Sequence, residues 1–141
     1  MRDFVLDASI ALAWAVDHPE PAAAREIRQS FLSGGLAIVP SLWVLEIANG
    51  LVQAERRGKV DIAEVERARS LYENMMSNYI EVQTDSPQAY FREIQEIARK
   101  HQLTAYDASY LFLALQHRLP LATLDGSLIA AAQKSRVAVL P

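Results

Sequence analysis

Short apolar segments alternate with longer helical ones along the whole chain, and this alternation constrains the fold more than any other feature. Segments with the length and apolar content of buried strands cover residues 3–7, 36–39, 79–83, 121–123 and 137–139. The segments between them place apolar side chains at helical spacing. Strands that alternate with helices form mostly parallel sheets with helices on both faces. We therefore predict a single α/β domain over residues 1–141.

The predicted helices have recognisable ends. We expect helices at residues 9–16, 20–33, 42–57, 62–76, 105–117 and 126–134, and another that starts at Ser86-Pro87. Ser41 and Gly58 are placed to cap the helix at 42–57. Asp61 and Glu64 have the spacing of a capping box at the start of the next helix, whose predicted inner face begins with Ile62.

Composition narrows the class of protein. Hydrophobic residues make up 51% of the 141 residues, which is sufficient for a core. No apolar run reaches the roughly 18 residues that a membrane span needs, and no secretory signal is visible. There is no cysteine, which excludes thiolate metal sites and suits the cytoplasm. The net charge of −3 argues against binding nucleic acid through bulk positive charge alone.

Four acidic residues occupy positions that such a fold would bring to one edge of the sheet. Asp7 ends the first predicted strand, and Asp125 follows the fourth. Glu46 lies in the first turns of the helix at 42–57, with Asn49 on the same polar stripe. Asp107 lies in the first turn of the helix at 105–117. Ligands of open parallel sheets bind at the carboxyl ends of strands, so we expect the four carboxylates to converge there.

Converging carboxylates need protons, basic partners or a metal ion. Two like charges about 4 Å apart cost roughly 4 kcal/mol at an effective dielectric constant of 20. No Lys, Arg or His lies within three residues of any of the four acids. Oxygen ligands without cysteine favour Mg²⁺ or Mn²⁺. A cation in such a site polarises phosphoryl oxygens and lowers the pKa of bound water, so phosphodiester hydrolysis is the natural reaction.

Each acid also has a purely structural interpretation. Asp7 and Asp125 stand where each could cap the helix that follows it. Asp107 could belong to a capping box begun by Thr104, and Glu46 could be partly exposed. The cluster Arg56, Arg57 and Lys59 is either a complement to the helix dipole or a contact for RNA phosphates. Trp14 and Trp43 suit core packing better than base stacking, and the three histidines are interpreted as surface or capping residues.

The segments that contain these acids resemble the motifs of PIN-domain proteins, and in particular of VapC-type toxins. The matching segments are Phe4-Val5-Leu6-Asp7-Ala8-Ser9, then Pro40-Ser41-Leu42-Trp43 leading to Glu46 and Asn49, then Leu103 to Tyr110 around Asp107, and Pro120 to Asp125. They occur in the family's order over nearly the whole chain. Asp7, Glu46, Asp107 and Asp125 match the family's acidic positions one for one.

The resemblance implies a three-layer α/β/α sandwich with a five-stranded sheet in the order 3-2-1-4-5. It implies cleavage of RNA that depends on Mg²⁺ or Mn²⁺, with Ser9 and Thr123 supporting the metal or its water. It also implies a toxin inhibited by a small antitoxin protein, and commonly a homodimer. A PIN-type nuclease that processes RNA without an antitoxin is the nearest alternative.

Two other classes of protein are alternatives to the nuclease. A receiver-type phospho-accepting domain is also a small α/β protein with clustered acids. It requires an acceptor Asp, for which Asp85 is available, and a Lys after its last strand, but the chain has no such Lys. A binding module with a degenerate site would not need all four acids.

Overall fold

The computed structural model describes residues 3–141 and contains a five-stranded parallel sheet in the order β3-β2-β1-β4-β5. The strands are β1 (Phe4–Leu6), β2 (Ala37–Val39), β3 (Ile80–Val82), β4 (Leu121–Ala122) and β5 (Val139–Leu140). The central strand β1, whose three residues are all buried, pairs with β2 on one side and β4 on the other. The predicted fold class and strand order are confirmed.

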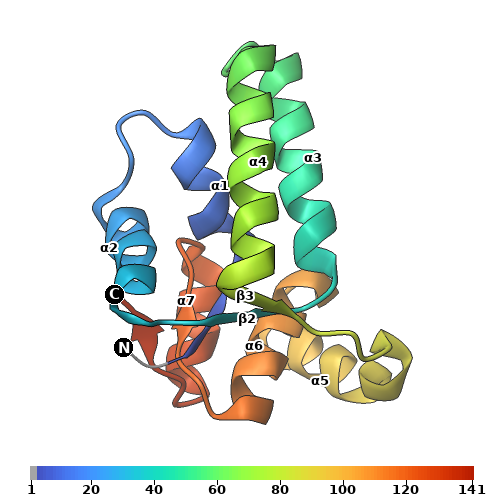
Figure 1. Ribbon diagram of the computed structural model, residues 1–141. Coiled ribbons are helices and arrows are strands. Elements are labelled where there is room, and N and C mark those ends of the chain that lie inside the picture. Colours follow the sequence, from blue (N-terminus) through green and yellow to red (C-terminus); the bar gives the residue numbers. More distant parts are fainter. Residues whose placement is uncertain (1–2) are drawn as a thin grey trace.

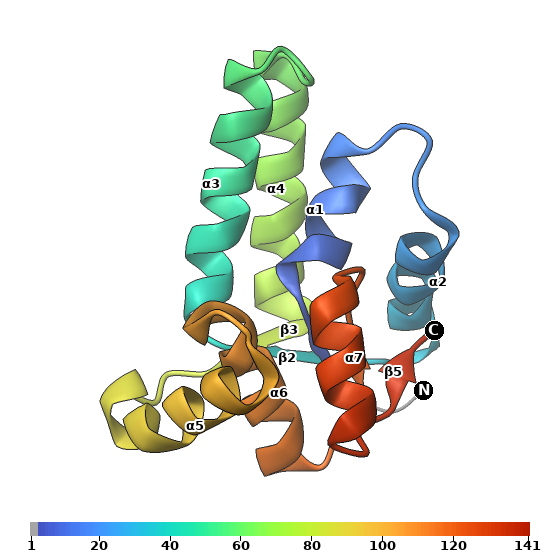
Figure 2. The same cartoon turned by 180° about the vertical axis from the view of Figure 1, so that it is seen from behind.

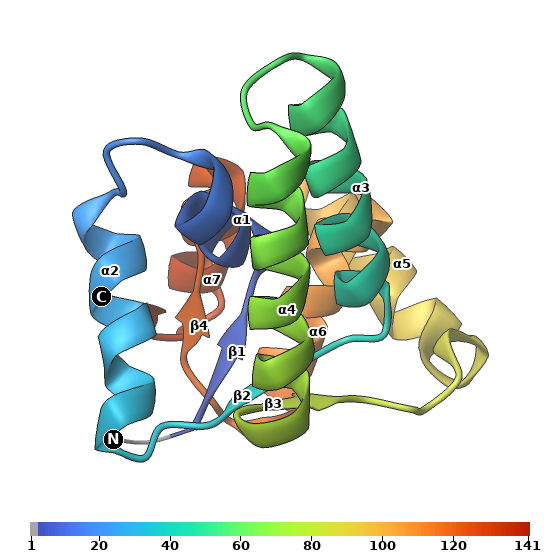
Figure 3. The same ribbon diagram turned by 45° about the horizontal axis from the view of Figure 1, so that its top comes forward.

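Helices cover both faces of the sheet. Helices α1 (Ala8–Val16), α2 (Ala22–Ser30), α3 (Leu42–Arg56) and α4 (Ile62–Asn78) lie on one side (Figure 1). Helices α6 (Ala105–His117) and α7 (Gly126–Lys134) cover the other, with α5 (Phe91–His101) packed on α6 (Figure 2). The hairpin of α3 and α4 extends past the end of the sheet (Figure 3). No helix within residues 3–141 has both the length and the apolar content to cross a bilayer.

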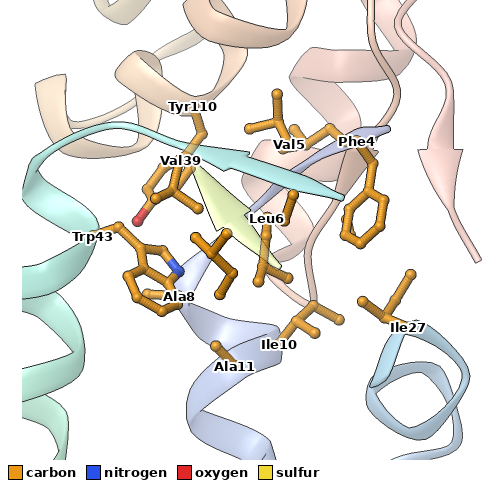
Figure 4. Packing of buried hydrophobic residues seen from close by; sticks show 14 of the residues in the cluster. Phe4, Val5, Leu6, Ala8, Ile10, Ala11, Ile27, Val39, Trp43 and Tyr110 are labelled. Carbon is orange, nitrogen blue, oxygen red and sulfur yellow. The ribbon is translucent and has the colours of Figure 1, made fainter. Parts of the chain in front are cut away.

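The core forms where apolar strand residues meet the inner faces of these helices. Phe4, Val5 and Leu6 are fully buried, as is Trp43, which follows β2 (Figure 4). Trp14 is partly buried and donates its indole N–H to the Ala24 carbonyl over 2.8 Å. Both tryptophans therefore serve the core, as the sequence predicts.

Several predicted helix ends are confirmed and others are wrong. The capping box of Asp61 and Glu64 is present at α4. Gly34 and Gly58 adopt positive φ angles of 87° and 71°, which favours glycine just after a helix. Ser41, however, has a helical backbone and its side chain makes no capping hydrogen bond. Ile62 is 68% exposed, because it is the first residue of α4 and α4 begins at the tip of the protruding hairpin.

Three further element boundaries differ from prediction. The last strand begins at Val139 rather than Val137, because the Val137 N–H bonds to the Ala132 carbonyl and closes the end of α7. Ser86 does cap a helix, but the first turn after it is the 3-10 helix η2 (Pro87–Tyr90). The predicted helix at 20–33 divides similarly into α2 and the 3-10 helix η1 (Phe31–Ser33).

Candidate active site

The carboxyl end of β1 delivers Asp7 to the point where the strand order reverses. The Asp7 backbone N–H bonds to the Ala122 carbonyl at 2.9 Å, which aligns the end of β1 with the end of β4. Because β1 and β4 run parallel side by side, the residues that follow them emerge at one edge. Thr123 and Asp125 come next in the chain after β4, and therefore lie beside Asp7.

Two hydroxyl groups meet at one oxygen of Asp7. Ser9 Oγ and Thr123 Oγ1 both donate to Asp7 Oδ2, each over 2.7 Å. Each hydroxyl in turn accepts a backbone N–H, that of Leu124 for Ser9 and that of Asp125 for Thr123. Since each hydroxyl has a single proton to give, the amides orient both protons toward Asp7. Asp7 Oδ1 accepts no side-chain hydrogen bond from residues 3–141.

The structure shows which of the acids have a role in helix capping. Asp7 occupies the N-cap position of α1, yet its side chain makes no capping hydrogen bond. Asp125 does cap α7, because its Oδ2 accepts the Leu128 N–H at 3.0 Å. At α6 the cap is Thr104, whose hydroxyl accepts the Asp107 N–H at 3.1 Å. A role in helix capping thus accounts for Asp125 and for the backbone of Asp107, and leaves the buried Asp7 carboxylate unexplained.

Helices α3 and α6 supply the other two acids. Glu46 and Asp107 are both half-buried. Glu46 Oε1 accepts a short hydrogen bond from the hydroxyl of Tyr110, which is fully buried on α6. Sequence reasoning missed Tyr110, although two signals were available: it lies one helical turn after Asp107, and a buried tyrosine hydroxyl needs a partner.

The pKa values of three carboxyls are raised, chiefly by burial. For Asp7, which is 4% exposed, hydrogen bonds from Thr123 and Ser9 oppose the effect of burial on the pKa, and the charge of Asp125 adds to it. The pKa of Glu46 is raised by burial and by the charges of Asp7 and Asp107. The pKa of Asp107 is raised by burial and by the charges of Asp7 and Asp125. All four predicted acids therefore interact through their charges.

The side chains of the site offer only oxygen atoms as ligands for a cation. These are carboxylate and hydroxyl oxygens, which suit Mg²⁺ or Mn²⁺. Within the described residues, no three acidic or histidine side chains are grouped to hold a metal ion by themselves. Mg²⁺ commonly binds through one or two carboxylates and keeps several waters, so the oxygens present fit a partly hydrated ion.

Other polar residues singled out in the sequence make no hydrogen bond with these acids within residues 3–141. Asn49 is exposed on α3, and no hydrogen bond joins its side chain to the acids. Arg56, Arg57 and Lys59 are exposed at the far end of the same helix, roughly 15 Å along its axis from Glu46. His18 faces Glu64 at 4.0 Å, and His101 lies 3.3 Å from the Ser135 hydroxyl. None of the three histidines lies among the acids.

Known proteins resemble this chain in sequence and in structure. The sequence profile of the PIN domain matches residues 4–134. The crystal structure of PAE2754 from Pyrobaculum aerophilum has 27% identity and a TM-score of 0.70, covering 97% of this chain and 82% of that one. The crystal structure of FitAcB from Neisseria gonorrhoeae has 21% identity and a TM-score of 0.56, covering 100% of this chain and 97% of that one. No curated protein sequence gives a significant match.

Proposed function

This chain belongs to the PIN domain family, and from that premise we propose that it is an endoribonuclease dependent on Mg²⁺ or Mn²⁺. PIN domains are generally nucleases that use divalent metals. The observation that supports the proposal most directly is Asp7: its carboxylate is buried, caps no helix, and accepts two oriented hydroxyl groups on one oxygen. Burial of a carboxylate is costly, and buried charges in proteins are usually paired with an opposite charge or bound to a metal ion.

The proposed roles follow from how each residue is held. Asp7 and Asp125, at the ends of adjacent strands, would lead in binding the ion, and Glu46 and Asp107 would complete the site or orient the attacking water. Ser9 and Thr123 hold Asp7 Oδ2, so that Oδ1 can face the ion. The bound cation would supply charge neutralisation at the scissile phosphate and a water of lowered pKa.

The cellular role proposed here rests on the resemblance to VapC-type toxins. The chain would act in the cytoplasm, would be inhibited by a small antitoxin protein and would form a homodimer. Its surface has apolar side chains available for such contacts, among them Leu45 on α3, Phe91 on α5 and Tyr106 on α6, each more than half exposed. A short neighbouring gene for a DNA-binding protein with a disordered tail would favour this role over antitoxin-free RNA processing.

The nuclease proposal can be tested with one pair of variants. Purified protein is incubated with RNA in the presence of Mn²⁺, and again with excess chelator. Asp7→Asn should reduce cleavage by about 10³-fold, beyond the 10- to 100-fold loss typical of residues outside the ligand set. Asp3→Asn is the matched control, because Asp3 is exposed at the amino end of the same strand. Equal activity of the two variants, or cleavage that survives the chelator, would contradict the proposal.

A further inference from the structure

A buried phenol joins two helices that belong to opposite layers of the fold. Helix α3 packs against α1 and α4, whereas α6 packs against α5, α7 and the central strand. Tyr110 extends from α6 past Val39 toward Trp43, which precedes Glu46 on α3 (Figure 4). Its hydroxyl donates to Glu46 Oε1. The hydrogen bond therefore fixes the position of an acid on one layer relative to the other layer.

Helix α6 places Tyr110 and Asp107 on the same face, since residues three apart are neighbours on a helix surface. Asp107 brings a carboxylate to the site, and Tyr110, one turn later, binds the carboxylate of Glu46 on α3. Within residues 3–141, the Tyr110 hydroxyl is the one hydrogen-bonding partner of the Glu46 side chain. Glu46 Oε2 is thus left without a hydrogen bond from the described residues.

We infer that Tyr110 is a positioning residue for the site, which acts through Glu46. It holds Oε1 and leaves Oε2 available to a divalent ion or its bound water, in a site where Glu46 already interacts with the charges of Asp7 and Asp107. This inference rests on the proposed metal-dependent nuclease and extends it to a residue outside the four acids. A hydroxyl that merely completed the core would have no effect on metal binding.

Tyr72 offers a matched comparison within the same core. It is also buried, and its hydroxyl donates to the Ala11 backbone carbonyl over 2.6 Å. Its ring packs edge-on against Trp43 with centroids 6.3 Å apart. Removing either hydroxyl breaks one buried hydrogen bond and preserves the aromatic ring, but only the Tyr110 hydroxyl contacts one of the four acids.

The test measures the Mn²⁺ dissociation constant by calorimetry without RNA, and the Mn²⁺ concentration for half-maximal cleavage with RNA. Tyr110→Phe should raise both by about 10- to 100-fold, the usual effect of losing a residue that orients a ligand. Tyr72→Phe should leave both unchanged, although its melting temperature falls by a comparable amount. Equal metal affinity of the two variants would overturn the role of Tyr110.

A double variant shows whether Tyr110 acts through Glu46. If it does, Tyr110→Phe combined with Glu46→Gln should bind Mn²⁺ no more weakly than Glu46→Gln alone, because the partner is already lost. Fully additive losses would overturn the inference. A wild-type protein that neither binds Mn²⁺ nor cleaves RNA would overturn the proposed function as well, whereas an active wild type with Tyr110→Phe matching Tyr72→Phe overturns only the inference.

The inference can also be tested on the wild-type protein, so that the result does not depend on whether a variant folds. Substoichiometric Mn²⁺ broadens nuclear magnetic resonance signals according to their distance from the ion. The ring signals of Tyr110 should broaden well before those of Tyr72. Simultaneous broadening, or earlier broadening of Tyr72, would place the ion away from Glu46 and overturn the inference.

Discussion

The two halves of the candidate site are held in different ways. The strand half comprises Asp7, Ser9, Thr123 and Asp125, whose side chains form a chain of hydrogen bonds with one another and with backbone amides. The helix half comprises Glu46, whose carboxylate accepts the Tyr110 hydroxyl as its one hydrogen bond from the described residues, and Asp107, whose backbone N–H donates to the Thr104 hydroxyl. Asp7 is almost fully buried, whereas both helix acids are half-exposed.

The difference indicates that the strand half is preorganised and that the helix half can adjust. Side chains locked by several hydrogen bonds lose little entropy when they bind a ligand, but they tolerate little change in length. Side chains with one anchor can shift to follow an ion or its waters.

Lengthening an acid should affect the two halves unequally. Asp7→Glu should reduce cleavage by about 100-fold, because a displacement near 1 Å in a rigid site has that effect. Asp107→Glu should stay within about tenfold of wild type, because that carboxylate can retreat toward solvent. Cleavage rates at saturating Mn²⁺ provide the measurement. Equal losses in the two variants would refute the contrast between a rigid and an adjustable half.

Removing a hydroxyl from the strand half should weaken the site without unfolding it. Thr123→Val preserves the shape of the side chain but deprives Asp7 of a donor and the Asp125 amide of an acceptor. We expect metal affinity to fall by about 10- to 100-fold. Thr123→Ser keeps the hydroxyl and should restore most of the affinity. Failure of the serine variant to recover would show that the methyl group, rather than the hydroxyl, matters.

The strand half should also govern how the stability of the metal-free protein depends on pH. The pKa of Asp7 is raised in the folded state from its ordinary value of 3.8. Its contribution to stability is therefore fully present below that value and is lost as the pH rises through the raised pKa. Relative to wild type, Asp7→Asn should become more stable as the pH rises over this range. Chemical denaturation at several pH values measures this difference, and Mn²⁺ should reverse it.

The smallest effect is expected far from both halves, at the start of α4. Asp61→Ala removes the capping box with Glu64 and should lower the free energy of unfolding by about 1 kcal/mol. Cleavage should be unchanged, since the cap lies at the tip of the protruding hairpin. A loss of activity larger than the loss of stability would show that the hairpin communicates with the acids.

The sequence allowed the strand half to be anticipated better than the helix half. Parallel strands bring their carboxyl ends to one edge, so Asp7 and Asp125 could be paired once β1 and β4 were expected to be neighbours. The hydrogen bonds that orient Ser9 and Thr123 depend on the loop after β4, which local patterns do not specify. The link from Tyr110 to Glu46 spans 64 residues and depends on how two layers pack, so periodicity alone could not reveal it.

Predictions of element ends succeeded where a local interaction decides them and failed where a distant one does. The capping box of Asp61 and Glu64 is local, and it is present. The exposure of Ile62 depends on how far the hairpin of α3 and α4 extends, and its predicted burial was wrong. The start of the last strand depends on how α7 ends, and its predicted position was wrong as well. The assignment of the four acids as a metal site stays a prediction.

The shortness of the outer strands has a consequence for how other proteins can attach. The sheet ends in β3, with three residues, and β5, with two, so neither border offers more than a short row of free amides and carbonyls. A foreign chain that tried to extend the sheet would find little backbone to pair with. Association with this molecule is thereby directed to the side chains of its helices.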